Sequence, residues 1–360
     1  MGINGEAHQA QPARGKRQEL ARWCHRAGVL SAVQRVRTLA RAEVRVLAYH
    51  RVLDIGDASR FEFDPALVSA SPEHFREQMT YVRDRYRPVS SSELISLVEE
   101  GRPLPRNAII VTFDDGYDDN YRIAFPILRE LGVPATFFVS TGHIDSGIPY
   151  AYDWLVHMIC MASAPKLEVP EVKLDMTLPS SLNRRHAIGA ELLDRMKWLN
   201  DAAQNAIIAR LEREWSMPRR PHPDCRPMNW DQLREMQAAG MDIGSHGVNH
   251  KMLAQLPVTE MIAEVQESKS ALDRELGVAA RTLSYPVGGP NAYSEAVVAA
   301  SREAGFRIAF NYISGSNPLP VADRYALHRL PVEYETDISW FAGIVTWPEL
   351  FSYPTRLRIG

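Results

Sequence analysis

The stretch that decides the fold is Asn107-Ala-Ile-Ile-Val-Thr-Phe-Asp-Asp-Gly-Tyr117. Its apolar run, residues 108–111 with Phe113, is short and rich in β-branched residues, as is typical of a strand buried on both faces. The run stops at Asp114-Asp115-Gly116, where glycine lets the chain turn sharply. Adjacent carboxylates repel each other unless a cation or a proton separates their roles. A bound metal could take one carboxylate and leave the other free as a base. An isolated Asp-Asp-Gly is more often only a polar turn, so this interpretation needs further support.

That support comes from Ser245-His246-Gly-Val-Asn-His250, which follows a second apolar strand at residues 241–244. Two histidines four residues apart can face one point. Imidazole nitrogens together with a carboxylate oxygen are an ordinary ligand set for zinc or another divalent ion. A histidine pair alone would more often lie on the surface of a loop, but the two motifs together favour a metal site.

The two motifs resemble the first two motifs of the polysaccharide deacetylase family (NodB homology, carbohydrate esterase family four). A third stretch, Leu283-Ser-Tyr-Pro-Val-Gly-Gly289, is similar to the Tyr-Pro-x-Gly variant of its exopolysaccharide-type branch. The likeness runs roughly over residues 44–332. It implies an α/β fold, a distorted, incomplete (β/α)7 barrel, and a metal-dependent N-deacetylase.

The resemblance also implies roles for single residues. Asp115, His246 and His250 would hold a divalent metal, with zinc expected, and Asp114 would take the proton of the attacking water. Amides resist hydrolysis, and a metal can polarise the carbonyl and lower the pKa of bound water towards ~7. The backbone N–H of Tyr117 would help to hold the oxyanion.

The general acid is open between two histidines. His328 lies in Leu327-His328-Arg329, which approximates the family's Leu-x-His, and it is the favoured acid. Strand alternation sends His328 and Arg329 to opposite faces, so Arg329 becomes the site residue if the register runs the other way. His50 ends the first predicted strand, where it either lines the barrel mouth or is structural. Tyr285 stands where many members have an arginine that tethers the base. We expect His50, Tyr117, Tyr285 and Arg329 to contact substrate.

Helix, glycine stop and apolar strand alternate along most of the chain, which is typical of parallel α/β folds. Predicted strands begin near residues 44, 108, 135, 241, 281, 306 and 326, and such a series should close into a barrel with its site at the carboxyl ends of the strands. Residues 141–227 interrupt the rhythm. They predict a helical insertion beside the barrel mouth, with one long helix over residues 191–215. Its aromatic residues Tyr150, Tyr152 and Trp154 either stack on sugar rings or, more commonly, pack the insertion down.

Composition limits the function classes. The chain has 360 residues, 45% of them hydrophobic, and a net charge of −3, which makes nucleic acid an unpromising partner. Three widely spaced cysteines argue against a disulfide scaffold and favour a reducing compartment. Residues 1–15 lack the apolar core of a secretory signal, and no segment has the length of a membrane span. We expect the protein in the cytoplasm. Peripheral contact with the inner face of the membrane is an additional hypothesis. Oligomeric state is not predicted.

The expected domain division is a basic, partly disordered helical arm, residues 1–43, followed by the deacetylase barrel, residues 44–360. Residues 14–45 hold nine basic side chains against two acidic ones, and their apolar residues recur at helical spacing. One or two amphipathic helices are expected. They either pack on the barrel with a solvated basic face, which is slightly favoured, or contact an anionic membrane.

The leading functional hypothesis is removal of N-acetyl groups from a polysaccharide, oligosaccharide or lipid-linked glycan in envelope or exopolysaccharide synthesis. A second is another C–N hydrolase on the same fold, such as a sugar deformylase. A third is a catalytically silent sugar-binding scaffold. The intact set Asp114, Asp115, His246 and His250 argues against the third, because a binding protein does not need all four.

Overall fold

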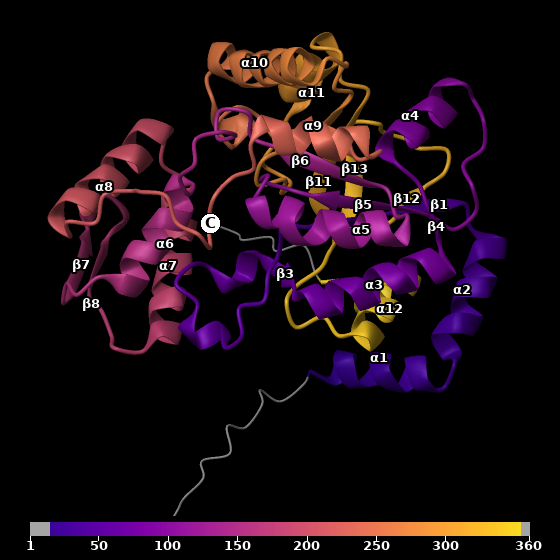
Figure 1. Cartoon of the computed structure of the whole chain (residues 1–360), viewed down its shortest axis with the longest axis horizontal. Coiled ribbons are helices and arrows are strands. Elements are labelled where there is room, and N and C mark those ends of the chain that lie inside the picture. The colour runs from indigo at the N-terminus through magenta and orange to yellow at the C-terminus, as the bar shows by residue number, and fades with distance from the viewer. Residues whose placement is uncertain (1–14, 354–360) are drawn as a thin grey trace, which may run out of the picture.

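A closed barrel of parallel strands lies at the centre of the computed structural model, which describes residues 15–353. Neighbouring strands follow the order β1, β5, β6, β9, β10, β11 and β13, and pairing of β1 with both β13 and β5 closes the ring. Figure 1 shows the strands surrounded by helices. The strand bounds are β1 Glu43–Tyr49, β5 Ala108–Phe113, β6 Ala135–Val139, β9 Asp242–Ser245, β10 Thr282–Ser284, β11 Ile308–Ser314 and β13 Leu327–Pro331. A register shift distorts the β11–β13 pair. The predicted (β/α)7 barrel is confirmed.

Strand β5 shows why the apolar run of the sequence is unbroken. Ile110 packs with Phe138 and Phe310 on one face, whereas Val111 and Phe113 belong to the core on the other face. Both faces are therefore covered, as in parallel sheets generally. Thr112 continues the face of Ile110 by alternation, which brings its hydroxyl to the barrel interior.

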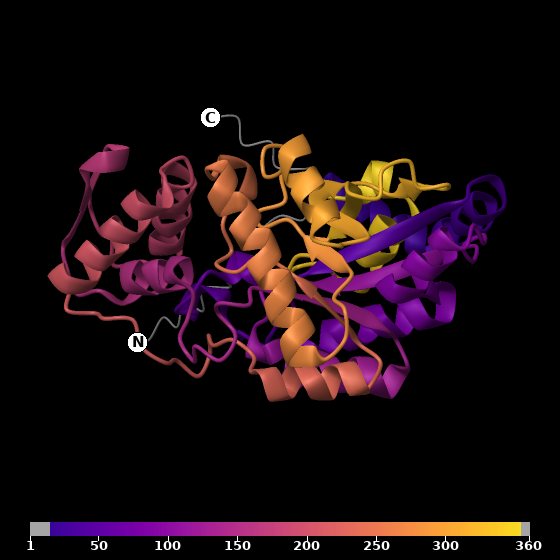
Figure 2. The same ribbon diagram turned by 90° about the horizontal axis from the view of Figure 1, so that it is seen from above.

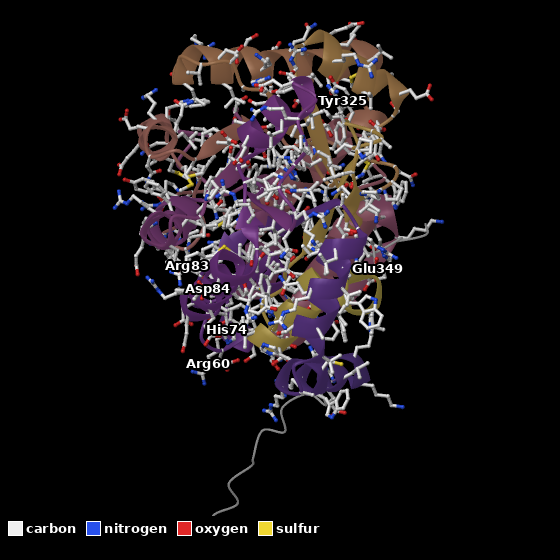
Figure 3. All side chains as sticks on the ribbon, turned by 90° about the vertical axis from the view of Figure 1, so that its right-hand side faces the viewer. Arg60, His74, Arg83, Asp84, Tyr325 and Glu349 are labelled. Carbon is white, nitrogen blue, oxygen red and sulfur yellow. The ribbon has the colours of Figure 1, made fainter. Side chains whose placement is uncertain are left out.

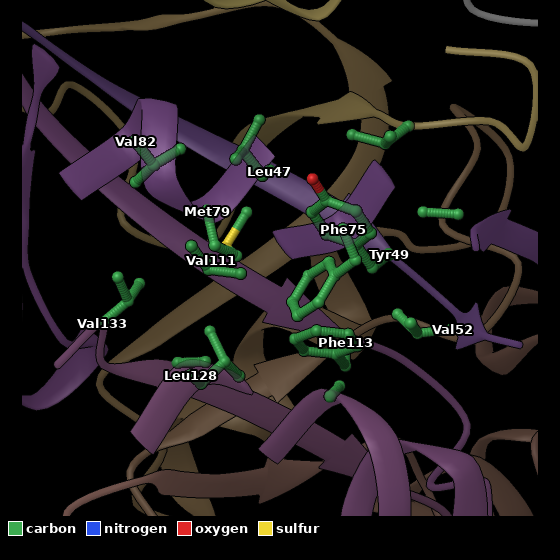
Figure 4. Packing of buried hydrophobic residues seen from close by; sticks show 14 of the residues in the cluster. Leu47, Tyr49, Val52, Phe75, Met79, Val82, Val111, Phe113, Leu128 and Val133 are labelled. Atoms are coloured by element: carbon green, nitrogen blue, oxygen red, sulfur yellow. The ribbon is translucent and has the colours of Figure 1, made fainter. Parts of the chain in front are cut away.

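An aromatic layer joins the outside of the barrel to the surrounding helices. Phe113 stacks on Phe137 at 4.7 Å and on Tyr49 at 5.4 Å, and Phe75 of helix α3 meets both Tyr49 and Phe113 (Figure 4). Each buried large apolar side chain contributes roughly 1.5–3 kcal/mol. The helices around the barrel are α3 Pro72–Arg85, α4 Ser91–Glu99, α5 Phe125–Leu131, α9 Trp230–Ala238, α10 Val258–Leu276, α11 Glu295–Glu303 and α12 Ile338–Thr346.

Two local signals place the ends of these helices. The Ser71 side chain accepts the N–H of His74 and caps α3, with Pro72 in the first turn. Helix α5 begins at Phe125, after a π-helical turn at Asn120–Ala124, and Pro126 lies in its first turn. Pro126 therefore marks the start of a helix.

The insertion lies on one side of the barrel (Figures 1 and 2). Its elements are α6 Ala151–Met161, β7 Lys166–Val169, β8 Leu174–Thr177, α7 Leu182–Met196 and α8 Asp201–Glu214. The prediction of one helix over residues 191–215 is wrong. Asn200 accepts the N–H of Ala203 and so starts a new helix, which separates α7 from α8. The insertion has its own apolar core, into which Phe63 and Tyr117 of the barrel loops also reach.

Helices α1 Lys16–Arg26 and α2 Val29–Ala40 pack against the barrel. Ala21, Cys24 and Leu30 are buried in the same cluster as the barrel's outer core. Glu349, in α13 Pro348–Phe351, forms ion pairs with two arginines of this segment and lies beside α2 in Figure 3. Residues 1–14 of the predicted arm lie outside the described residues, and the arm–barrel boundary stays a prediction. Within residues 15–353 no helix combines the length and apolarity that crossing a membrane requires.

Short strands complete the described structure. They are β2 Arg51–Val52, β3 Val68–Ala70, β4 Arg87–Pro88 and β12 Asn317–Pro318. Strands β2 and β3 pair beside the carboxyl end of β1, so they hold the loop that follows His50 against the barrel mouth.

Candidate active site

A cleft of about 1450 Å³ lies at the carboxyl ends of the barrel strands and extends along the insertion. Its lining includes His50, Asp114, Asp115, His143, Tyr150, Tyr152, Trp198, His246, His250, Tyr285, Tyr312 and Arg329. A cleft therefore lies where the sequence predicts the site, and the insertion supplies one of its walls.

Asp115, His246 and His250 converge in this cleft. The Nε2 atoms of His246 and His250 stand 3.5 Å and 3.2 Å from Asp115 Oδ1. Ligand atoms of a tetrahedral zinc site with bonds of ~2.0–2.1 Å are about 3.3 Å apart, so the spacing fits. Asp115 Oδ1 is buried without a hydrogen-bond partner in the described chain, as a ligand oxygen would be.

Neighbouring groups prepare these three side chains for a cation. His246 Nδ1 lies 2.7 Å from the carbonyl of Ser284. Because a carbonyl only accepts, Nδ1 carries the proton and Nε2 offers its lone pair to the cluster. Burial alone would raise the pKa of Asp115, but His250 and His246 hold it well below its usual range. The residues present thus fit a divalent metal.

The turn after β5 places Asp115 by backbone conformation. Asp115 and Gly116 have φ angles of 75° and 76°, in the left-handed region. A Cβ at Gly116 would stand 2.9 Å from a methyl carbon of Val139, so a larger residue does not fit there. Tyr150 of the insertion donates its hydroxyl to the Asp115 carbonyl at 2.7 Å. The turn is fixed from both the barrel and the insertion.

The loop between the two histidines is held by Glu264 of α10. Its buried carboxylate accepts the backbone N–H of Val248 at 2.8 Å and of Asn249 at 3.0 Å. It also accepts the Asn249 side-chain amide at 2.8 Å. These bonds fix the path of the chain between His246 and His250. The sequence pattern contains no sign of Glu264, because the contact joins the loop to a distant helix.

Asp114 is paired with Arg329 and forms no ion pair with the histidines among the described residues. The guanidinium donates to Asp114 Oδ1 at 2.8 Å and to Oδ2 at 2.7 Å, and Arg329 is fully buried. Further bonds to Ser284 Oγ and the Asn311 carbonyl orient the arginine. Burial alone would raise the pKa of Asp114, but Arg329, followed by His246, holds it below its ordinary value. Asp114 is therefore ionised near neutral pH, and Arg329 fixes the orientation of its carboxylate, as a general base requires.

Arg329, in β13, is the arginine that holds Asp114 in this chain. Strand β13 turns Arg329 into the barrel, so His328 points to the opposite face. His328 is absent from the cleft lining among the described residues, and its backbone N–H donates to Asn317. The predicted placement of His328 at the site is wrong, because the register runs the other way.

His50 lines the cleft at the end of β1, with its ring 5.4 Å from that of Tyr312. Burial lowers the pKa of His50, while the carboxylates of Asp115 and Asp114 act in the opposite direction. A histidine near both aspartates remains available for proton transfer. Of the two predicted acids, His50 and His328, His50 is the one that lines the cleft.

The phenol groups of the two predicted substrate tyrosines are engaged elsewhere. Tyr117 donates to Asp153 Oδ2 at 2.9 Å beneath the insertion. Tyr285 donates to the Tyr325 carbonyl at 3.0 Å and stacks on Tyr293 at 4.4 Å. Both hydroxyls are thus occupied within the protein, while Tyr285 lines the cleft, and contact of these residues with substrate stays a prediction. The Tyr117 backbone N–H stays the predicted oxyanion donor.

The aromatic residues of the insertion mainly brace the site. Tyr150 stacks on His143 at 3.5 Å and on Tyr152 at 4.9 Å, and the Tyr152 ring lies 5.3 Å from His250. Trp154 is buried and donates to the Met217 carbonyl. Their packing role matches the commoner of the two alternatives, although Tyr150 and Tyr152 also line the cleft.

Comparisons with known proteins agree with this geometry. A family model described as polysaccharide deacetylase matches residues 101–309. YxkH of Bacillus subtilis (strain 168), whose name describes it as a polysaccharide deacetylase, is 20% identical to this chain over 298 residues. The alignment covers 82% of this chain and 74% of that protein. The poly-β-1,6-N-acetyl-D-glucosamine N-deacetylase of Escherichia coli (strain K12) is 35% identical over 101 residues, 28% of this chain but only 14% of that protein.

Solved structures show the same fold. IcaB from Ammonifex degensii aligns with a TM-score of 0.54 and 20% identity, over 84% of this chain and 97% of that one. The Streptococcus pyogenes deacetylase PplD, solved in complex with acetate, aligns with a TM-score of 0.54 and 17% identity, over 87% of this chain and all of that one.

Proposed function

The chain belongs to the polysaccharide deacetylase family, and from this premise we propose that it is a metal-dependent N-deacetylase of an N-acetylated glycan. One observation carries the proposal. A metal-type cluster, Asp115 with His246 and His250, lies beside an ionised carboxylate, Asp114, both of whose oxygens accept hydrogen bonds from a buried arginine. A sugar-binding scaffold has no need of this arrangement.

The chain's own residues divide the chemistry of amide hydrolysis. A metal held by Asp115, His246 and His250 would polarise the carbonyl and make a bound water more acidic. Asp114 accepts the proton of the attacking water, and Arg329 fixes its orientation. The backbone N–H of Tyr117 donates to the oxyanion, and His50 protonates the departing amine.

The size of the cleft favours a polymeric or oligomeric substrate. Its volume of about 1450 Å³ exceeds the roughly 300–1,000 Å³ of ordinary small-molecule pockets. Trp198, 51% exposed between α7 and α8, lines the part of the cleft that is formed by the insertion. Together with the exopolysaccharide deacetylases among the relatives, this favours a glycan of envelope or exopolysaccharide synthesis.

The test is acetate release from N-acetylated glucosamine oligomers of increasing length, with N-formylated sugars as the second arm. We expect acetate release that rises with length. Formate release without acetate release would show a sugar deformylase instead. If neither acetate nor formate is released, the hypothesis of a catalytically silent sugar-binding scaffold would stand instead.

The acid role can be decided from pH profiles. A general acid must be protonated, so kcat should fall as pH rises through the pKa of the acid. We expect His50→Ala to lose this alkaline limb, together with a kcat loss on the order of 10²–10⁴-fold. His328→Ala serves as the control and should keep the wild-type profile. If His50→Ala keeps the alkaline limb of the kcat profile, a group other than His50 is the general acid.

We also propose peripheral contact with anionic membrane at the cytoplasmic face. Trp23 is 63% and Leu20 is 41% exposed on α1, a helix with several basic residues, each worth about 1 kcal/mol near anionic lipid. Leu20→Ser/Trp23→Ser should weaken sedimentation with phosphatidylserine vesicles and spare turnover of soluble substrate. Val258→Ser, at a site 62% exposed on α10, is the control. Equal sedimentation of all three proteins would leave α1 as a packing element only.

A further inference from the structure

A second group of one carboxylate and two imidazoles lies outside the catalytic cleft. Glu62, His157 and His222 place three potential ligand atoms within 4.8 Å of one another. Glu62 lies in the loop after β2, His157 in α6 of the insertion, and His222 in the proline-rich loop before α9. Segments far apart in the sequence therefore bring together a His, His, Glu set, which is a frequent zinc ligand combination.

The distances suit a cation better than hydrogen bonds. His157 Nδ1 and His222 Nε2 each stand 3.6 Å from Glu62 Oε2. This is too long for a hydrogen bond, which needs about 2.7–3.2 Å. It is close to the separation of about 3.3 Å between ligands that share a zinc ion. In the catalytic cluster the corresponding distances are 3.5 Å and 3.2 Å.

His157 supplies an independent observation. The residue is 5% exposed, and its Nδ1 has no hydrogen-bond partner in the described chain. Leaving a buried polar atom unpaired is unfavourable, so such an atom calls for a partner. His157 Nδ1 and Glu62 Oε2 therefore lie close together without a hydrogen bond between them, which is the arrangement that a shared cation would explain.

The surroundings orient the rings and leave an entry path. The ring centroid of Phe63 lies 4.8 Å from that of His157, on which it stacks, and 4.9 Å from that of His222 in an edge-on contact. The Trp154 ring centroid lies 4.5 Å from that of His157. The Glu62 side chain is 41% exposed, so the group opens to solvent on that side. Three protein ligands and an open side leave a fourth position for water.

One contact has to change. His222 Nδ1 accepts the backbone N–H of Asp224 at 3.2 Å. Binding through Nε2 requires the proton on Nδ1, so this hydrogen bond would be lost. Structural zinc binding stabilises small domains by far more than one hydrogen bond does, so the loss does not prevent it.

We propose that Glu62, His157 and His222 bind a second divalent cation, zinc or a similar ion, which fastens the insertion to the barrel loops. The loop of His222 continues to Arg226, whose carbonyl accepts the N–H of Asp118, and to Met228, which donates to the Gly116 carbonyl. The cation would therefore stiffen the loop that backs the Asp-Asp-Gly turn. Its role is structural and separate from the hydrolytic chemistry.

Metal counting on the full chain tests the proposal. The protein is loaded with zinc, passed over a desalting column and analysed by mass spectrometry. We expect two zinc ions per chain in the wild type and one in Glu62→Gln/His222→Gln. The matched control, His74→Gln/Glu171→Gln, changes the same residue types at other surface positions and should keep two.

A His246→Ala/His250→Ala background separates this test from the catalytic proposal. There we expect one zinc ion and a zinc-dependent rise in Tm, both lost when Glu62→Gln/His222→Gln is added. If the double change in the second group perturbs folding, Glu62→Gln alone should weaken zinc binding in this background by more than about 10-fold. Zinc binding in this background that Glu62→Gln and Glu62→Gln/His222→Gln leave unchanged would overturn the second site, whatever the catalytic site does.

Discussion

Asp114→Asn is expected to keep the metal at the Asp115 cluster while kcat falls on the order of 10²–10⁴-fold, the usual contribution of a general base. The reason is geometric. Both Asp114 oxygens receive hydrogen bonds from Arg329, whereas Asp115 Oδ1 faces the two histidines. Metal content and kcat are measured on the same preparation, by mass spectrometry and by acetate release.

The neighbouring carboxylate is the matched control. Asp115→Asn should lose the metal and, with it, the activity. Asp114→Asn also leaves the Arg329 guanidinium without its counter-charge, so circular dichroism must show that the protein is folded at the assay temperature. If Asp114→Asn loses the metal while Asp115→Asn retains it, the two roles are assigned the wrong way round.

Arg329→Met should lower the free energy of unfolding by about 3–5 kcal/mol, because it leaves the Asp114 carboxylate buried without a partner. Arg329 is 0% exposed, and its bonds reach Thr112 of β5, Ser284 of β10 and Asn311 of β11 across the barrel interior. Denaturant unfolding measures the change. The double variant Arg329→Met/Asp114→Asn should be destabilised by less than the sum of the two single changes. An additive result would mean that the pair is not coupled.

The pH dependence of this effect has a defined sign. The pKa of Asp114 in the folded protein is lowered, so its contribution to stability is present above its unfolded pKa of about 3.9 and is lost as pH falls through the folded value. In Arg329→Met burial acts without the arginine and raises that pKa. The stability difference between wild type and variant should therefore be largest at a pH above the raised pKa of Asp114 in the variant. It should shrink as pH falls through that raised pKa and towards the lowered pKa of Asp114 in the wild type. A difference that grows in acid would contradict the assignment.

The sequence predicts most of what the backbone pattern controls. Helix, glycine stop and buried strand recur in order, so the seven strands and the convergence of Asp115, His246 and His250 at their carboxyl ends follow from local signals. The family resemblance then supplies roles for these residues. Asp114 next to Asp115 is readable as a ligand beside a base because the two carboxylates are adjacent.

Features that depend on long-range contacts are not readable in this way. The register of β13 decides whether His328 or Arg329 faces inward, and alternation alone allows both. Glu264 and Tyr150 support the site from a helix and an insertion whose packing the pattern does not fix. The break between α7 and α8 follows from the Asn200 cap, a signal that competes with a continuous apolar periodicity.

Acetate release from an N-acetylated glucosamine oligomer, measured before and after chelation, tests the central claim most directly. The wild type should release acetate, lose this activity on removal of metal and regain it when zinc is restored. His246→Ala/His250→Ala should stay inactive with or without zinc, since Asp115 alone cannot hold the ion. Full activity after verified metal removal, or in the metal-free histidine variant, would contradict the account.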